Sequence, residues 1–253
     1  MLVTTPPPLT PDNALFLDFD GTLVEIAPRP DGIVLDPMLR GALARLHQRL
    51  GGAVAIVSGR PIAEIDHWLQ PLQLPCAGVH GAERRSEAGV VTTVHATTAV
   101  AAVAERLQAL AARHAGLLVE RKSVSVALHY RLAPQLEPVC RAMLQEAVSQ
   151  EPSLRLLQGK QVLEVLPRGV GKGHAIDTFL AEPPFKGRCP VFVGDDVTDE
   201  AGFQRVQQRG GIAVKVGPGE TAAQCRIDNP VAVRQWLCAP LADSSPSAHA
   251  HRT

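Results

Sequence analysis

The sequence has no net charge, no long apolar run and no paired cysteines, and each absence excludes a class of protein. Lys and Arg together number 25, and so do Asp and Glu. Without an excess of positive charge, the chain lacks the broad field that attracts nucleic acid or an anionic membrane, so we expect neither as a partner. An anionic ligand must then be bound by a local site.

Apolar runs and cysteines exclude further classes. No uninterrupted apolar stretch approaches the roughly 20 residues that cross a bilayer. Residues 1–12 are rich in proline and lack the basic and apolar regions of a signal peptide. The 5 cysteines are dispersed and form no C-x-x-C pair, which argues against structural disulfides and a thiolate zinc site. We therefore expect a cytoplasmic protein.

Between its two ends the chain alternates short apolar strands with helices. Strands are expected near Ala14–Leu17, Ala53–Val57, Cys76–Val79, Val191–Gly194 and Ile212–Val216. Helical spacing of apolar residues intervenes, as over Asp36–Leu50, where Leu39, Leu43 and Leu46 recur on one face. This alternation predicts an α/β fold with a doubly wound parallel sheet.

The middle of the chain has a different pattern. Its strand-like segments come in adjacent pairs separated by helices near Thr98–His114 and Pro138–Gln150, which is typical of an α+β module with an antiparallel sheet. A strand near Val90–Val94 is expected to belong to it. We therefore predict a flexible N-terminus (1–12), a discontinuous parallel-sheet domain (13–84 plus 167–240), an inserted α+β domain (85–166) and a flexible tail (241–253).

Two aspartates follow the first predicted strand. Residues 18–23 read D-F-D-G-T-L and lie at a strand's carboxyl end, where open α/β sheets bind ligands. Side chains alternate along an extended chain, so Asp18 and Asp20 face the same side, and Gly21 lets the backbone turn away. Two close carboxylates can act as nucleophile and proton donor. A polar turn with an Asx bend is the alternative.

Three later segments contain residues that suit phosphate or metal. Ser58, in an S-G-R turn that is expected to open a helix, offers a hydroxyl to phosphate oxygens, although such serines are often only helix N-caps. Lys172 lies among glycines at a predicted helix start, outside any P-loop pattern, where its ammonium can reach a phosphate. Residues 194–200, G-D-D-V-T-D-E, place four carboxylates after an apolar strand. A cation such as Mg²⁺ would offset their repulsion, and a solvated acidic turn is the alternative.

In this order the four segments resemble the haloacid-dehalogenase (HAD) phosphatase superfamily. The resemblance implies a Rossmann-like HAD core with an inserted cap, and an aspartyl-phosphate formed on Asp18. Asp20 would protonate the leaving alkoxide and later activate water. Mg²⁺ would be held by the Asp18 carboxylate, the Asp20 backbone carbonyl and Asp195. Further implied residues bind phosphate (Ser58, Gly59 and Lys172) or support the site (Thr22, Arg60, Asp196 and Asp199).

The inserted segment looks like the cap of the trehalose-6-phosphate phosphatases. Residues 78–83, G-V-H-G-A-E, resemble that family's G-x-H-G-x-E hinge. E-R-K at 120–122 with H-Y-R at 129–131, and K-Q-V-L-E at 160–164, resemble its cap motifs. Mixed carboxylates and ammoniums suit sugar hydroxyls, and the even spacing puts each pair on one face of a strand. The implied substrate-binding residues are His80, Gly81, Glu83, Glu120, Lys122, Arg131, Lys160 and Glu164.

The resemblance implies hydrolysis of trehalose 6-phosphate, a sugar phosphate, to trehalose and phosphate, as the last step of trehalose biosynthesis. The alternatives are a sucrose-phosphate or mannosyl-phosphoglycerate phosphatase, and a non-catalytic sugar-phosphate sensor. Charged residues at period two can also be the solvent face of a sheet. Mn²⁺ and Co²⁺ accept oxygen ligands as Mg²⁺ does. The pattern indicates no oligomeric state.

Overall fold

The computed structural model describes residues 4–26, 32–95, 97–159 and 161–240. Its strands are β1 (Asn13–Leu17), β2 (Val54–Val57), β3 (Cys76–Gly78), β4 (Glu83–Arg85), β5 (Val91–Thr93), β6 (Leu118–Arg121), β7 (Val126–His129), β8 (Leu154–Gly159), β9 (Val162–Pro167), β10 (Cys189–Gly194), β11 (Ile212–Val216) and β12 (Cys225–Ile227). Its α-helices are α1 (Pro37–Arg49), α2 (Ile62–Leu69), α3 (Thr98–Ala111), α4 (Glu137–Gln150), α5 (Lys172–Leu180), α6 (Glu200–Gln208) and α7 (Pro230–Cys238). Short 3₁₀ helices span Val79–Gly81, Pro134–Leu136 and Val197–Asp199.

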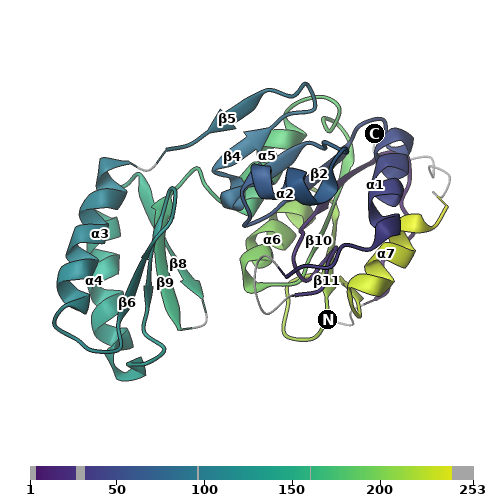
Figure 1. Cartoon of the computed structure of the whole chain (residues 1–253). Coiled ribbons are helices and arrows are strands. Elements are labelled where there is room, and N and C mark those ends of the chain that lie inside the picture. The colour runs from purple at the N-terminus through teal and green to yellow at the C-terminus, as the bar shows by residue number, and fades with distance from the viewer. Residues whose placement is uncertain (1–3, 27–31, 96, 160, 241–253) are drawn as a thin grey trace, which may run out of the picture.

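The described residues form two bodies, each built on its own sheet (Figure 1). The larger sheet has eight strands in the order β12-β11-β10-β1-β2-β3-β4-β5, parallel from β12 to β3 and antiparallel at β4 and β5. The smaller sheet is antiparallel, in the order β6-β7-β9-β8. Its strands all lie between β5 and α5 in the sequence. The smaller body is therefore an insertion into the larger one, as the sequence pattern predicts.

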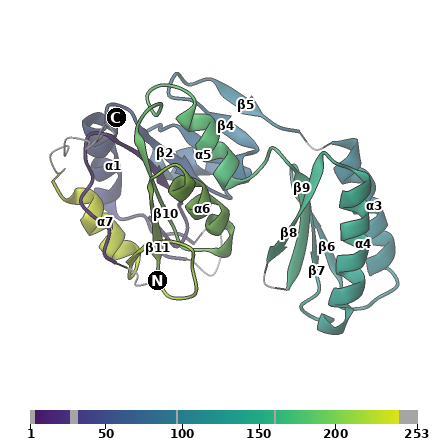
Figure 2. The ribbon, with the colours of Figure 1, turned by 180° about the vertical axis from the view of Figure 1, so that it is seen from behind.

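Helices cover both faces of the larger sheet. In β1, Leu15 and Leu17 pack with α1, α2 and α7, whereas Ala14 and Phe16 pack with α5 and α6. All four side chains have 0% exposure, as expected for a parallel strand that is buried on both faces. Figure 2 shows α5 and α6 in front of this sheet. A ligand therefore reaches the sheet at the carboxyl ends of its parallel strands.

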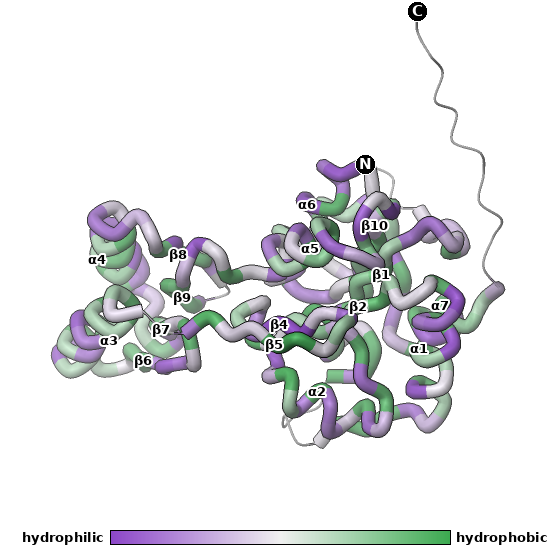
Figure 3. Tube along the Cα trace, turned by 90° about the horizontal axis from the view of Figure 1, so that it is seen from above, coloured by the Kyte–Doolittle hydropathy of each residue, from purple (hydrophilic) through white to green (hydrophobic). Residues whose placement is uncertain are grey.

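Helices cover only one face of the smaller sheet. Leu128 and Leu163 pack with α3 and α4, while Glu120, Ala127 and Glu164 are in register across β6, β7 and β9 on the opposite face. Helices α3 and α4 lie on the side of the sheet that is remote from the larger body (Figures 1 and 3). The uncovered face, with its two glutamates, therefore turns toward the larger body.

The strand near Val90–Val94 belongs to a different sheet from the one expected. Strand β5 pairs with β4, with Thr92 opposite Arg84, and so extends the larger sheet. Local composition identifies a strand but not its partner, and the charged segment of β4 carries no strand signal of its own. We propose that the inserted domain begins near residue 97 rather than 85 and ends near residue 166.

Part of the N-terminus that was expected to be flexible packs on the larger body. Thr4 forms a β-bridge with Cys225, Leu9 is buried, and the indole N–H of Trp236 donates to the Pro7 carbonyl over 3.0 Å. The predicted flexible tail, residues 241–253, lies outside the described residues. Among the helices of the described ranges, none combines the length and the apolar character needed to span a bilayer.

Candidate active site

A buried lysine joins two aspartates at the carboxyl end of the parallel sheet. Asp18 follows β1, Lys172 begins α5 and Asp199 precedes α6. Nζ of Lys172 lies 3.0 Å from Oδ1 of Asp18 and 2.6 Å from Oδ1 of Asp199. The three residues are only 5%, 4% and 0% exposed, in the order Asp18, Lys172, Asp199. Charges this deeply buried persist because each has a partner of opposite sign.

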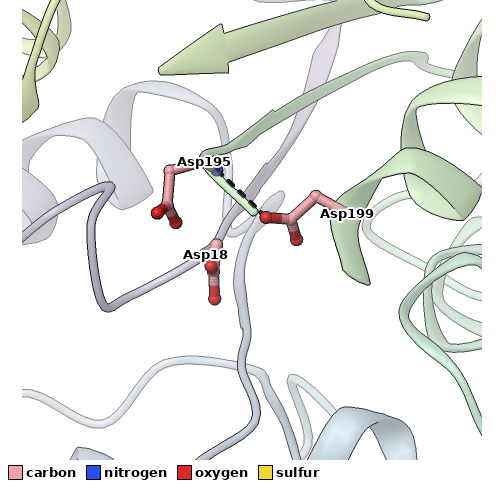
Figure 4. Close-up of side chains that lie close together, drawn as sticks. All are labelled: Asp18, Asp195 and Asp199. Atoms are coloured by element: carbon pink, nitrogen blue, oxygen red, sulfur yellow. Dashed lines mark hydrogen bonds between the residues drawn. The ribbon is translucent and has the colours of Figure 1, made fainter. Parts of the chain in front are cut away.

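Asp199 also organises the acidic loop after β10. Its Oδ2 accepts the backbone N–H groups of Asp195 over 3.0 Å, drawn in Figure 4, and of Asp196 over 2.9 Å. The Asp195 carboxylate accepts a hydrogen bond from the fully buried Thr22 hydroxyl over 3.4 Å. Gly21 has φ = +72°, and a Cβ at this position would lie 2.1 Å from Oδ2 of Asp195. Glycine is therefore required for the close approach of the two loops.

Three carboxylates of this site are crowded. Oxygens of Asp18, Asp195 and Asp199 all lie within 4.8 Å of one another (Figure 4). Burial, followed by the negative charge of Asp199, raises the pKa of Asp195 to about 6. Burial also raises the pKa of Asp18 well above its ordinary value, although Lys172 opposes that effect. The ionised carboxylates are therefore short of positive charge.

The donor set fits a hard divalent cation. Carboxylate oxygens are the ligands that such ions prefer, and a bound cation would remove the shortage of positive charge. Asp199 already binds Lys172 and two backbone N–H groups. Asp18 pairs with Lys172 through one oxygen, and Asp195 accepts one hydrogen bond from Thr22, so these two carboxylates are better placed than Asp199 as ligands.

The Asp20 side chain stands apart from this cluster and pairs with Arg60. Nε of Arg60 lies 2.6 Å from Oδ2 of Asp20, and Nη2 lies 2.8 Å from Oδ1. Nη1 of Arg60 donates to Oε2 of Glu64 over 3.0 Å. The Asp20 side chain is 36% exposed. Asp20 therefore lies at the rim of the site, where it is open to solvent.

Ser58 lies in the site but does not open a helix, contrary to the sequence expectation. It follows β2 and is 1% exposed. Helix α2 begins only at Ile62, with Pro61 as its N-cap. The Ser58 hydroxyl instead accepts the backbone N–H of Arg60 over 3.1 Å, which closes a tight turn.

Two pockets meet at this site. The first, of about 560 Å³, is lined by residues that include Asp18, Asp20, Ser58, Gly59, Arg60, His80, Lys172, Asp195 and Asp196. The second, of about 610 Å³, lies between the larger body, hereafter the core, and the uncovered face of the smaller body, hereafter the cap. Both are lined by Asp20, Gly59, Arg60 and His80. A molecule bound in one pocket can therefore extend into the other.

The turn after β3 places His80 at the junction of the pockets. Val79, His80 and Gly81 have φ values of 48°, 54° and 98°, a costly conformation for a β-branched valine. The Val79 N–H is held by the Arg60 carbonyl over 3.0 Å. Burial is the main cause that lowers the pKa of His80 to about 4, so its imidazole is neutral at pH 7.

Charged cap residues line the second pocket and pair with one another. Nζ of Lys122 lies 3.1 Å from Oε2 of Glu164, whose Oε1 accepts a hydrogen bond from the Ser125 hydroxyl. Nε2 of His129 lies 2.8 Å from Oε2 of Glu120. Glu120, Lys122 and Glu164 all line the pocket. These charges therefore face a cavity beside the active site, which favours ligand binding over a plain solvent-facing surface.

Other predicted substrate-binding residues lie elsewhere. Glu83 accepts the backbone N–H of Ile62 over 2.9 Å and so caps α2. Gly81 belongs to the turn after β3, and Arg131 is exposed after β7. None of these three belongs to the lining of the two pockets. Lys160 lies outside the described residues.

Sequence reasoning missed two charged residues of the site. Nζ of Lys215 donates to the carbonyls of Asp195 and Val216, over 2.6 Å in each case, and so supports the acidic loop. Lys215 is 6% exposed, and burial lowers its pKa. The available signal was a lysine in the apolar strand I-A-V-K-V, since buried lysines are rare. Glu64 lines the second pocket beside Arg60 and gave no sequence signal.

Comparisons with known proteins agree on one family. The family model described as trehalose-phosphatase matches residues 16–232. The trehalose-6-phosphate phosphatase of Escherichia coli (strain K12) is 43% identical over 236 residues, which cover 93% of this chain and 89% of that protein. The structure of Aspergillus fumigatus trehalose-6-phosphate phosphatase, crystal form 3, has a TM-score of 0.74 at 27% identity and covers 88% of this chain and 90% of that chain.

A more distant structure shares the fold. A haloacid dehalogenase-like hydrolase from B. subtilis has a TM-score of 0.66 at 14% identity, covering 88% of this chain and 98% of that chain. This likeness supports a HAD core. The matched family model, by contrast, runs from β1 into α7 and includes all the residues that line the two pockets. The chain therefore belongs to the trehalose-phosphatase family.

Proposed function

We propose that this chain hydrolyses trehalose 6-phosphate to trehalose and phosphate, with Asp18 as the covalent nucleophile. The observation that carries the proposal is the junction of two pockets. One holds the buried Asp18 and Lys172, and the other is lined by carboxylates and an ammonium of the cap. The phosphate ester of a disaccharide needs a pocket of each kind. Relatives are named for this substrate.

In the first half of the reaction, a carboxylate oxygen of Asp18 attacks phosphorus and the bond to the sugar oxygen breaks. A carboxylate that approaches a phosphate dianion is repelled unless positive charge is nearby. Lys172 lies 3.0 Å from Asp18 and can bind a phosphoryl oxygen as charge spreads in the transition state. The Ser58 hydroxyl lines the same pocket as Lys172 and can donate a further hydrogen bond to the phosphoryl group. Asp20, at the rim, gives its proton to the departing sugar oxygen.

In the second half, water attacks the phosphorus of the aspartyl-phosphate. Asp20, now ionised, accepts the proton of that water. The bond between Asp18 and phosphorus breaks, which restores the carboxylate and releases phosphate. Asp20 thus acts first as an acid and then as a base.

We propose Mg²⁺ as the cofactor, held by the carboxylates of Asp18 and Asp195 and, as the family resemblance implies, by the backbone carbonyl of Asp20. When bound, the ion supplies positive charge that offsets the charge of the nucleophile and the phosphate. The chain prepares this site with two buried residues. Asp199 and Lys215 hold the backbone of the loop that presents Asp195.

The cap residues Glu120, Lys122 and Glu164 bind hydroxyls of the sugar in this proposal. Each already has a hydrogen-bond partner on the cap, so a sugar hydroxyl replaces an existing contact. Substrates that lack the hydroxyls are rejected, because the polar groups that they cover would lose their partners. The neutral His80, at the junction, is placed to contact the substrate between its phosphate and its sugar.

Trapping the covalent intermediate tests this proposal. The enzyme is mixed with trehalose 6-phosphate and Mg²⁺, quenched with acid during turnover, digested and analysed by mass spectrometry. We expect the added mass of a phosphoryl group on the peptide that contains Asp18, and none in Asp18→Asn. Sustained turnover by Asp18→Asn would contradict the proposed nucleophile.

A further inference from the structure

Arg60 connects the two pockets through its side chain. Its guanidinium makes two hydrogen bonds to Asp20 and a third to Glu64. Arg60 and Asp20 line both pockets, whereas Glu64, on α2, lines only the second pocket, which lies beside the cap. The Arg60 side chain is only 12% exposed, although it lies between two cavities. The guanidinium of Arg60 therefore connects Asp20 to Glu64, a carboxylate that lines the second pocket.

The backbone fixes the point from which this side chain extends. The Arg60 N–H donates to Oγ of Ser58 over 3.1 Å, and its carbonyl accepts the Val79 N–H over 3.0 Å. A Cβ at Gly78 would lie 2.8 Å from the Arg60 carbonyl oxygen, so the end of β3 packs directly against the Arg60 backbone. Arg60 thus starts from a rigid position between β2 and α2, which a positioning role requires.

Both side-chain hydrogen bonds that Asp20 accepts within the described ranges come from Arg60. The Asp20 side chain is 36% exposed, so packing alone leaves it free to change rotamer. A guanidinium fork binds both oxygens of a carboxylate at once and so sets the plane of the group. A lysine ammonium is a point charge and cannot set that plane.

We infer that Arg60 is a positioning residue for Asp20, and that Glu64, in the lining of the second pocket, holds the Arg60 side chain in place. The inference rests on the proposed function, since it takes Asp20 as the acid that protonates the sugar oxygen. When Asp20 acts as the acid, one carboxyl oxygen carries the proton that passes to the sugar oxygen, and the other keeps its hydrogen bond from Arg60. Arg60 thus aligns Asp20 with the sugar oxygen, and Glu64 stabilises the alignment. Neither residue is required to bind the substrate itself.

The choice of leaving group separates positioning from binding. A sugar alkoxide must be protonated as it departs, whereas p-nitrophenolate leaves without an acid. The value of kcat/KM covers only the steps up to departure of the leaving group. A misaligned Asp20 should therefore lower kcat/KM for trehalose 6-phosphate and spare that for p-nitrophenyl phosphate.

The experiment compares Arg60→Lys and Glu64→Gln with the wild type, in Mg²⁺, on both substrates. We expect kcat/KM for trehalose 6-phosphate to fall about 30-fold in Arg60→Lys and about 3-fold in Glu64→Gln, with less than about 2-fold change for p-nitrophenyl phosphate. Arg209→Lys is the matched control, because Arg209 pairs with Asp177 at the surface. It should leave the ratio of the two kcat/KM values unchanged.

A binding measurement completes the test. In an Asp18→Asn background, calorimetry gives the Kd of trehalose 6-phosphate with and without Arg60→Lys, and we expect the two values to agree within about 2-fold. Equal losses of kcat/KM on both substrates, or a Kd that rises as much as kcat/KM falls, would overturn the positioning role. A wild-type enzyme with no activity on trehalose 6-phosphate would instead overturn the proposed function. Glu64→Gln changes an exposed helical side chain, so it keeps the test informative if Arg60→Lys is unstable.

Discussion

The core pocket and the cap face hold their charges in opposite ways. Asp18, Lys172 and Asp199 are at most 5% exposed and meet at the ends of three different elements. On the cap, the side chains of Glu120, Lys122 and Glu164 are 48%, 32% and 14% exposed and lie on or beside one uncovered sheet. The charges of the core are buried inside the fold, whereas those of the cap lie on a partly exposed face of its sheet.

This difference separates the chemistry from the choice of substrate. Removing one partner of a buried ion pair leaves an uncompensated charge, which destabilises the protein and disables the site. Exposed pairs contribute little to stability, so they can exchange partners with sugar hydroxyls at low cost. Changes in the core should therefore affect every phosphate ester, and changes on the cap only those that carry the sugar.

The largest expected effect comes from Asp18→Asn. Turnover should fall about 10⁴-fold or more on any ester, because the amide is not a nucleophile. The fold should persist, since Lys172 keeps Asp199 as its partner and one of three crowded charges is removed. Phosphate release and circular dichroism measure the two outcomes. A variant that unfolds would show that Asp18 is needed for structure as well.

Lys172→Met should be the next most damaging change. It removes the cation between Asp18 and Asp199, so turnover should fall about 10²–10³-fold on both a sugar phosphate and p-nitrophenyl phosphate. The free energy of unfolding in EDTA should fall by about 3–5 kcal/mol, because two buried carboxylates lose their partner. Urea denaturation measures this loss. Unchanged stability would indicate that the buried carboxylates do not depend on Lys172.

On the cap, Glu164→Lys should act on substrate choice alone. KM for trehalose 6-phosphate should rise about 10-fold or more, while KM for p-nitrophenyl phosphate changes less than about 2-fold. The control is Glu105→Lys, which reverses a charge paired with Arg121 on the outer side of the cap. Equal effects of Glu164→Lys on both substrates would mean that Glu164 is structural and would remove the contrast between the regions.

The smallest effect concerns pH, at the junction of the two regions. The pKa of His80 is about 4 in the folded protein and about 6.5 when unfolded. Below pH 6.5 the unfolded chain binds the proton more readily, so stability should fall as pH decreases from 6.5 toward 4. Between pH 7 and 5 the wild type should lose about 2 kcal/mol more than His80→Gln in urea denaturation. Identical losses would show that His80 is not buried enough to resist protonation.

The sequence predicted the core site better than the cap face. Asp18, Ser58, Lys172 and Asp195 each follow an apolar strand or begin a helix, and parallel strands bring their carboxyl ends to one edge. Local patterns therefore sufficed to bring them together. They could not show whether the Ser58 hydroxyl caps α2 or closes the turn before it, because both arrangements use the same residue types.

Long-range contacts account for what the sequence did not show. Strand β5 was assigned to the wrong sheet because strand propensity does not specify a partner. Glu83 was expected to bind substrate, but its carboxylate caps α2. Lys215 gains its role from Asp195, which is 20 residues away in the chain. Glu64 gains its role through Arg60, whose partner Asp20 is 40 residues away. A motif specifies residue types, whereas the contacts between distant segments are determined by the fold.

The most direct test of the account is phosphate release from a panel of sugar phosphates, measured with Mg²⁺ and again with EDTA. The panel includes trehalose 6-phosphate, sucrose 6-phosphate, mannosyl-phosphoglycerate and glucose 6-phosphate. We expect a strong preference for trehalose 6-phosphate, and we expect EDTA to abolish the activity. Equal rates on all of them would contradict the role of the cap, and undiminished rates in EDTA would contradict the metal site.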